Sequence, residues 1–181
     1  MMRVLKNILS QLHVYLVWLI LSVVLWGFVF NLLTDAPAEK KLLLFAEVGG
    51  VREREFCAEL EKSKPAGIRM LQAHSFDYVM FDEQSLLSAD LYIVPLERVE
   101  GYRDSFRALD LSRLPAEELS FYELDGAPCG IRVWDGEAGA ASGYFAYGEG
   151  EYYLFLGANS LHAGEPDDAA YWMIGEILKM Q

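Results

Sequence analysis

One uninterrupted apolar stretch, residues 14–33, constrains this chain more than any other feature. Its twenty residues, VYLVWLILSVVLWGFVFNLL, carry no formal charge, and Ser22 and Asn31 are the only polar side chains besides the aromatic ones. At about 1.5 Å of rise per residue, a helix of this length spans roughly 30 Å, the hydrocarbon thickness of a bilayer. A helix also satisfies its backbone hydrogen bonds internally, so the sequence predicts one transmembrane helix whose partner is the lipid bilayer.

Two alternatives compete with a permanent anchor. A cleaved signal peptide would explain the basic start (Arg3 and Lys6) and the A-x-A pattern of residues 36–38, and would release a secreted form. However, signal cores usually run about 7–15 apolar residues, and a proline occupies the middle of this triplet. A buried core helix would not need apolar residues on every side over five turns. The anchor is therefore our main interpretation.

The charges beside the span bear on its orientation. Arg3 and Lys6 precede it and Lys40 and Lys41 follow it, which is close to a tie by the positive-inside rule. A long domain translocates largely regardless of its charge, whereas a short basic tail stays behind. We therefore expect a single-pass protein of the cell membrane with a cytoplasmic tail (1–13), the span (14–33), a tether (34–40) and an extracytoplasmic domain (41–181).

The region after the span is acidic and of single-domain size. Residues 35–181 hold all 27 acidic residues of the chain, but Arg3 and Lys6 are among its 15 basic ones, which leaves 13 and a net charge of −14. This charge argues against nucleic acid as a partner and against adhesion to anionic lipid headgroups. Its length suits one domain with a substantial core.

The cysteine and histidine content gives no sign of a metal or cofactor site. Cys57 and Cys129 could form a disulfide in an exported domain, but they fall in a predicted helix and a predicted strand, so two free buried thiols are the favoured interpretation. His74 and His162 are isolated in the sequence, and no residue pair has the spacing of a zinc site. We expect no cofactor.

The pattern of apolar residues predicts an α/β domain. Its first part alternates strands and helices, and its strands are nearly continuously apolar, which is typical of a parallel sheet covered on both faces. Its second part has short β segments separated by glycine-rich turns, which suggests antiparallel additions. The predicted strands are 41–47, 68–72, 90–95, 121–124, 131–134, 144–147 and 152–156, and the predicted helices are 51–62, 76–87, 97–106 and 169–180.

Several segments resemble the first lobe of the extracytoplasmic solute-binding proteins of ABC importers. The segments are KLLLFAE, SFDYVMFDEQSLLSADLYIVPLERVEGY, FRALD, DGAPCGIRVWD and EYYLFLGANSLHAG. In this family a small or acidic residue precedes the third strand, as Ala89-Asp90 does here. The resemblance implies one periplasmic-binding-protein-like lobe of three layers, with a mostly parallel sheet plus antiparallel strands. It departs from the family at Cys129, where an aromatic residue is usual, and in length, because those proteins have two lobes and are about twice as long.

Open α/β sheets bind ligands beyond the carboxyl ends of their strands. This rule selects candidate ligand-binding residues after the first strand, after the third strand and on the later crossing strand: Glu47, Gly49, Gly50, Glu97, Arg98 and Trp134. Each has an ordinary structural alternative. The two glycines also suit a plain strand–helix turn, the charged pair a solvated helix start, and the tryptophan a place in the core.

Catalysis finds no support in the sequence. No P-loop, G-x-S-x-G, H-E-x-x-H or G-x-G-x-x-G motif is present. We therefore expect a non-catalytic, membrane-anchored binding or interaction module, which holds a small solute or docks on a membrane protein such as a transporter. The alternative is a structural or assembly protein of the cell surface that uses the lobe as a scaffold. Fold analogy alone does not separate the two.

Overall fold

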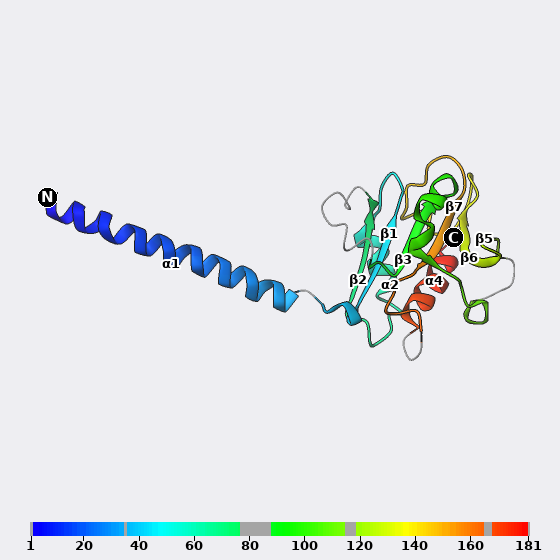
Figure 1. The fold of residues 1–181 in the computed structure, drawn as a ribbon, viewed down its shortest axis with the longest axis horizontal. Coiled ribbons are helices and arrows are strands. Elements are labelled where there is room, and N and C mark those ends of the chain that lie inside the picture. Colours follow the sequence, from blue (N-terminus) through cyan, green and yellow to red (C-terminus); the bar gives the residue numbers. More distant parts are fainter. Residues whose placement is uncertain (1, 35, 77–87, 115–118, 165–167, 181) are drawn as a thin grey trace. The chain divides into compact units, whose positions relative to one another are not determined.

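The computed structural model describes residues 2–34, 36–76, 88–114, 119–164 and 168–180 (Figure 1). The chain divides into two units, residues 1–37 and residues 38–181. The first consists of the long helix α1 (Met2–Thr34). Among the described residues, one segment of α1, Leu12–Phe30, is long and apolar enough to cross a membrane, a test that a signal sequence also passes.

The second unit is built on one mixed sheet (Figure 1). The strands follow the order β2-β1-β3-β7-β6-β5, and the short strand β4 pairs separately with β7. Their bounds are Lys41–Ala46 (β1), Met70–Ser75 (β2), Leu91–Pro95 (β3), Phe106–Arg107 (β4), Phe121–Leu124 (β5), Ala127–Trp134 (β6) and Tyr152–Gly157 (β7).

The first three strands form the parallel part of the sheet. β1 lies in the middle and pairs in parallel with β2, where Lys41 is opposite Met70, and with β3, where Ala46 is opposite Ile93. Helix α2 (Glu53–Leu60) connects β1 to β2. Because β2 and β3 lie on opposite sides of β1, the strand order reverses here, and the carboxyl ends of β1 and β3 form a topological switch point.

The remaining pairings are antiparallel. β7 pairs with β3, β6 and β4, and β6 pairs with β5. The chain is therefore a mixed α/β protein, as predicted, but antiparallel pairs make up more of its sheet than the sequence suggested. Strands β3 and β7 lie in the centre of the sheet, where the segments LYIV and YYLFLG are buried along their whole length. Their β-forming, apolar composition suits this position.

Both faces of the sheet carry a core of buried side chains. On one face, α2 and α4 (Ala169–Lys179) contribute Phe56, Leu60 and Ile174 to a cluster with alternate residues of β1, such as Leu42. On the other face, Phe45 and Phe155 pack with Val99 of the 3-10 helix η3 (Leu96–Ser105). A sheet covered on both faces explains why its strands have few polar positions.

Two predicted elements differ from the structure. Residues 144–147 do not form a strand; Ala141, at φ 54°, opens a turn in which its carbonyl accepts the N–H of Tyr144, and Phe145 makes a single bridge to Val51. The helix predicted over 97–106 is the 3-10 helix η3. Residues 77–87 of the helix predicted over 76–87 lie outside the described residues. The other predicted helices and strands are present, with ends shifted by a few residues.

The two cysteines belong to opposite sides of the sheet. Cys57 on α2 packs against the cluster that contains Leu42, whereas Cys129 on β6 belongs to the cluster that contains Phe45. Both are free. The sheet between them keeps the two thiols from meeting in the folded domain.

Candidate functional site

The residues selected from the sequence gather at one edge of the sheet, which we call the carboxyl edge. β1 and β3 end there, and so does β6, because it runs antiparallel to β7 and β7 antiparallel to β3. β7 begins there, where the N–H of Leu96 donates to the carbonyl of Glu151 over 2.9 Å. The predicted residues therefore share one end of the domain, although they lie far apart in the sequence.

Glu47 and Arg98 meet across the switch point. The Arg98 Nη2 lies 3.0 Å from the Glu47 Oε1, and the side chain of Glu47 is only 21% exposed. The second carboxylate oxygen, Oε2, is buried and has no hydrogen-bond partner among the described residues. A buried carboxylate oxygen without a donor is costly in a folded protein, and it is the kind of atom that a ligand N–H or O–H can satisfy.

The surroundings of Glu47 oppose its ionisation. Burial raises the pKa of this carboxyl above its ordinary value, and the charge of the neighbouring Glu97 adds to the effect. The Arg98 guanidinium and the Tyr102 hydroxyl act in the other direction but do not cancel the burial. Glu97 itself is exposed at the surface and contributes its charge to this edge.

The two glycines after β1 are covered by the chain itself. The N–H of Gly49 donates to the carbonyl of Ala146 over 2.9 Å, and the N–H of Ala146 donates to the carbonyl of Gly50 over the same distance. Neither glycine has a positive φ. The Gly49 amide is therefore not available to a ligand, and residues 144–147 occupy the space above the turn.

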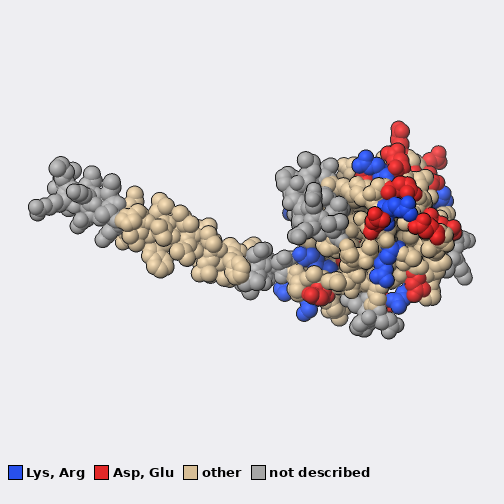
Figure 2. Space-filling view, viewed as in Figure 1, with Lys and Arg blue, Asp and Glu red and all other residues tan. Residues whose placement is uncertain are grey.

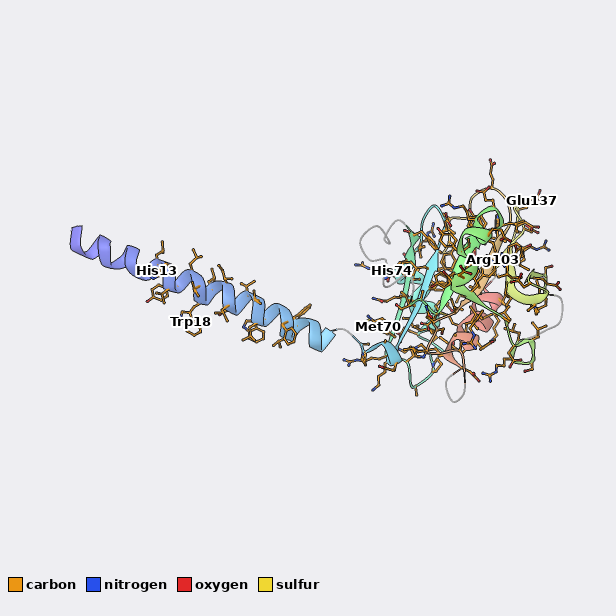
Figure 3. The ribbon with its side chains drawn as sticks, viewed as in Figure 1. His13, Trp18, Met70, His74, Arg103 and Glu137 are labelled. Atoms are coloured by element: carbon orange, nitrogen blue, oxygen red, sulfur yellow. The ribbon has the colours of Figure 1, made fainter. Side chains whose placement is uncertain are left out.

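Trp134 lies beside this covering segment. Its indole stacks on the ring of Tyr147, with centroids 5.0 Å apart and planes 11° apart. The indole nitrogen is buried without a hydrogen-bond partner among the described residues. Trp134 also lines an open groove of about 660 Å³ together with Asp135 and Glu137, and Figure 3 shows Glu137 at the rim of the domain.

Two contributors to this edge escaped the sequence-based prediction. Tyr147 holds Trp134 in place, and its hydroxyl donates to the carbonyl of Ala140 over 3.0 Å. Arg132 and Glu151 form a second ion pair, with 3.0 Å between Nη1 and Oε1. Only the outward position of Arg132 in an otherwise apolar strand could have signalled that pair.

The structure thus joins Glu47 to Arg98, places Glu97 near them, and links Trp134 to the two glycines through residues 144–147. Two polar atoms of this edge, the Glu47 Oε2 and the Trp134 indole nitrogen, are buried without a hydrogen-bond partner among the described residues. Among the residues that the structure describes, no group of three His, Cys, Asp or Glu side chains could hold a metal ion.

Comparisons with known proteins add no relative. No family model matches the chain, and a search of curated proteins and one of solved structures find no significant match either.

Proposed function

We propose that this chain is a non-catalytic, membrane-anchored binding or interaction module. In this proposal residues 14–33 are a permanent anchor, and residues 41–181 form an extracytoplasmic domain equivalent to one three-layer lobe of a solute-binding protein of an ABC importer. The observation that carries the proposal is the unsatisfied Oε2 of Glu47, held beside Arg98 at the switch point of the sheet.

The strand order supports this assignment. The order β2-β1-β3 makes the carboxyl ends of β1 and β3 a topological switch point, the place where open α/β sheets bind ligands. Several strongly charged side chains line this end of the domain, whereas the sheet behind them is apolar on both faces. The edge is therefore a polar site supported by a rigid core, which is the arrangement that orients ligand-binding groups.

The chemistry of the edge indicates the class of ligand. A partly buried carboxylate with a free acceptor oxygen favours a cationic solute or one rich in N–H donors, such as a polyamine or a basic peptide. In this proposal the single lobe supplies only one wall of the site, and a shallow site buries too little of a small molecule for tight capture. In our proposal a membrane protein, such as a transporter, supplies the opposing wall.

A ligand screen on the full chain in detergent tests this proposal. We expect polyamines or basic peptides to raise the melting temperature of the wild type, since a ligand that binds only the folded state stabilises it. Glu47→Gln should abolish this shift, whereas Glu55→Gln, which removes an exposed carboxylate on α2, should preserve it. A shift that survives in Glu47→Gln, or the absence of any shift with polyamines, basic peptides and sugars, would refute this site.

One observation favours the second candidate, a structural or assembly protein of the cell surface. Residues 144–147 already form hydrogen bonds with the turn at Gly49 and Gly50, so that part of the edge is covered by the chain itself and leaves these backbone groups unavailable to a solute. A stable complex with another membrane protein, isolated from native membranes and independent of added solutes, would support this candidate. Protease treatment of intact cells tests the topology of both, because an extracytoplasmic domain is digested without lysis.

A further inference from the structure

A second surface lies at the opposite end of the sheet, where the domain begins. We define the tether surface by three exposed residues, Lys40, Arg69 and Leu161. In Figure 3, Met70, the neighbour of Arg69, lies at the end of the domain where the chain enters, far from Glu137. The N–H of Arg69 donates to the carbonyl of Lys40 over 2.8 Å, which places the backbones of these two residues side by side.

Leu161 is the most exposed large apolar residue among the described residues of the domain, at 60%. It lies beside the tether, because it lines a hollow of about 220 Å³ together with Ala38 and Lys41. Single exposed leucines are ordinary, so its position matters more than its exposure.

Hydrogen bonds of the two neighbouring residues, Ser160 and His162, hold the loop that carries Leu161 in place. Ser160 donates to the buried carboxylate of Asp90 over 2.6 Å. His162 is 1% exposed, and its Nε2 lies 3.0 Å from the carbonyl of Lys41 and 3.2 Å from that of Ala38. Since carbonyls only accept hydrogen bonds, this nitrogen carries the proton. The histidine therefore ties the Leu161 loop to the first residues of the domain.

The charges of the tether surface differ from those of the domain as a whole. Lys40 and Arg69 are exposed, and neither forms an ion pair with a carboxylate of the described residues. The exposed Glu39 offsets one of the two charges. In Figure 2, blue side chains lie where the domain begins, whereas red ones dominate the far end of the visible face. The strong negative net charge is therefore unevenly distributed.

The length of the tether limits how far this surface can lie from the membrane. Consecutive Cα atoms are about 3.8 Å apart, so Ala38 stays within about 15 Å of Thr34 in any arrangement. If α1 remains in the bilayer, Thr34 is only four residues beyond the apolar segment that ends at Phe30. The start of the domain then lies in or just above the headgroup layer, within a distance at which charges act on lipids.

From these observations we infer that the tether surface docks on the bilayer that holds α1, with Leu161 in the headgroup region and with Lys40 and Arg69 on anionic lipids. This docking directs the carboxyl edge away from the membrane. Docking on anionic lipid differs from the expectation based on the net negative charge of the domain, which argued against adhesion to anionic headgroups. The inference rests on the proposed anchor but not on the proposed ligand site.

Fluorescent labelling of the full chain in lipid nanodiscs tests the docking. The variants Leu161→Cys and Leu96→Cys place a label on exposed leucines at opposite ends of the sheet. The native thiols interfere little, because Cys129 is buried and Cys57 is only partly exposed. The discs contain phosphatidylcholine and phosphatidylglycerol in equal parts, with nitroxide quenchers on the headgroups. We expect strong quenching at position 161 and weak quenching at position 96.

A matched pair of charge reversals tests the contribution of anionic lipid. In the Leu161→Cys background, Arg69→Glu should lower the ratio of docked to undocked domain about fivefold or more, the equivalent of one lost basic contact. Arg54→Glu reverses another exposed arginine, on α2, and should leave that ratio unchanged. In the Leu161→Cys chain that keeps Arg69, high salt and discs of pure phosphatidylcholine should weaken the quenching of the label.

The outcomes separate the docking from the anchor. Equal quenching at positions 161 and 96, in chains that remain inserted in the discs, overturns the docking and leaves the anchor intact. A chain that fails to insert into discs shows instead that the anchor is wrong. If the label at position 161 is shielded in cells but fully exposed in nanodiscs, the surface binds a protein and the lipid assignment is wrong.

Discussion

The buried carboxylate of Asp90 accepts a hydrogen bond from the backbone N–H of Leu43 over 2.9 Å, across 47 residues of sequence. Its other oxygen accepts the hydroxyl of Ser160 over 2.6 Å, and Asp90 itself is only 3% exposed. One side chain therefore ties the start of β3 to β1 and to the loop after β7. This role explains an acidic residue before the third strand without any reference to ligand binding.

Replacing Asp90 by alanine should therefore destabilise the domain. The change leaves the N–H of Leu43 and the hydroxyl of Ser160 without their acceptor, and we expect a loss of about 2–4 kcal/mol in the free energy of unfolding. Urea unfolding of the full chain in detergent, followed by tryptophan fluorescence, measures the loss. Asp104→Ala removes an exposed carboxylate and serves as the control. Equal stabilities of the two variants would contradict the structural role of Asp90.

Gly157 should tolerate no side chain. A Cβ atom there would lie 2.1 Å from the carbonyl oxygen of Ala89, a backbone atom at the start of β3. We expect Gly157→Ala to cost about 3 kcal/mol, because the central pairing of β3 with β7 would have to shift. Gly175→Ala is the matched control: a Cβ there meets nothing within 4 Å, and alanine in the helix α4 should stabilise the protein by about 0.5–1 kcal/mol. The same urea experiment distinguishes a loss from a gain.

The sequence predicted correctly those helices and strands whose formation depends mainly on their own residues. The segment 90–95 is a central strand because four consecutive β-forming residues can be buried only between two covered faces. The common location of Glu47 and Arg98 was also predicted, since residues after neighbouring parallel strands share an edge, but their ion pair was not.

Tertiary contacts decided what the sequence did not show. Three of the four residues 144–147 are aromatic, a composition typical of a strand, but the φ of 54° at Ala141 turns the chain, so Tyr147 stacks on Trp134 instead of joining the sheet. An alanine at positive φ has no sequence signature. The covering of Gly49 by Ala146 likewise depends on a contact between segments almost one hundred residues apart.

The two cysteines should remain reduced under oxidising conditions. They lie on opposite faces of the sheet, and burial together with Glu53 and Glu61 raises the pKa of the Cys57 thiol to about 11. Because the thiolate is the reactive form, we expect slow modification at neutral pH and full modification after unfolding. Ellman titration of the native and the urea-denatured chain measures this difference. A non-reducing gel that shows an intramolecular disulfide would contradict the arrangement of the helix and the strand that carry them.

The raised pKa of Glu47 should make stability depend on pH in a defined direction. Folded Glu47 retains its proton to a higher pH than the unfolded chain does, because burial opposes its ionisation. Between the unfolded pKa, about 4.3, and the higher folded value, the folded state binds more protons, so this carboxyl lowers stability as the pH rises through that window. Glutamine has no charge to desolvate and escapes this loss.

We therefore expect the melting temperature of Glu47→Gln to rise relative to that of the wild type as the pH increases from 4 to 7. The melting temperature of Arg98→Gln should instead fall relative to that of the wild type over the same range. The substitution removes the cation that favours ionised Glu47 and so raises the pKa of Glu47 in the folded state further. Differential scanning fluorimetry across the pH range compares both variants with Glu55→Gln, which controls for the loss of a surface charge. An identical pH profile for Glu47→Gln and Glu55→Gln would show that the carboxylate at the switch point is not held in a buried, unsatisfied state, and the proposed ligand site would lose its basis.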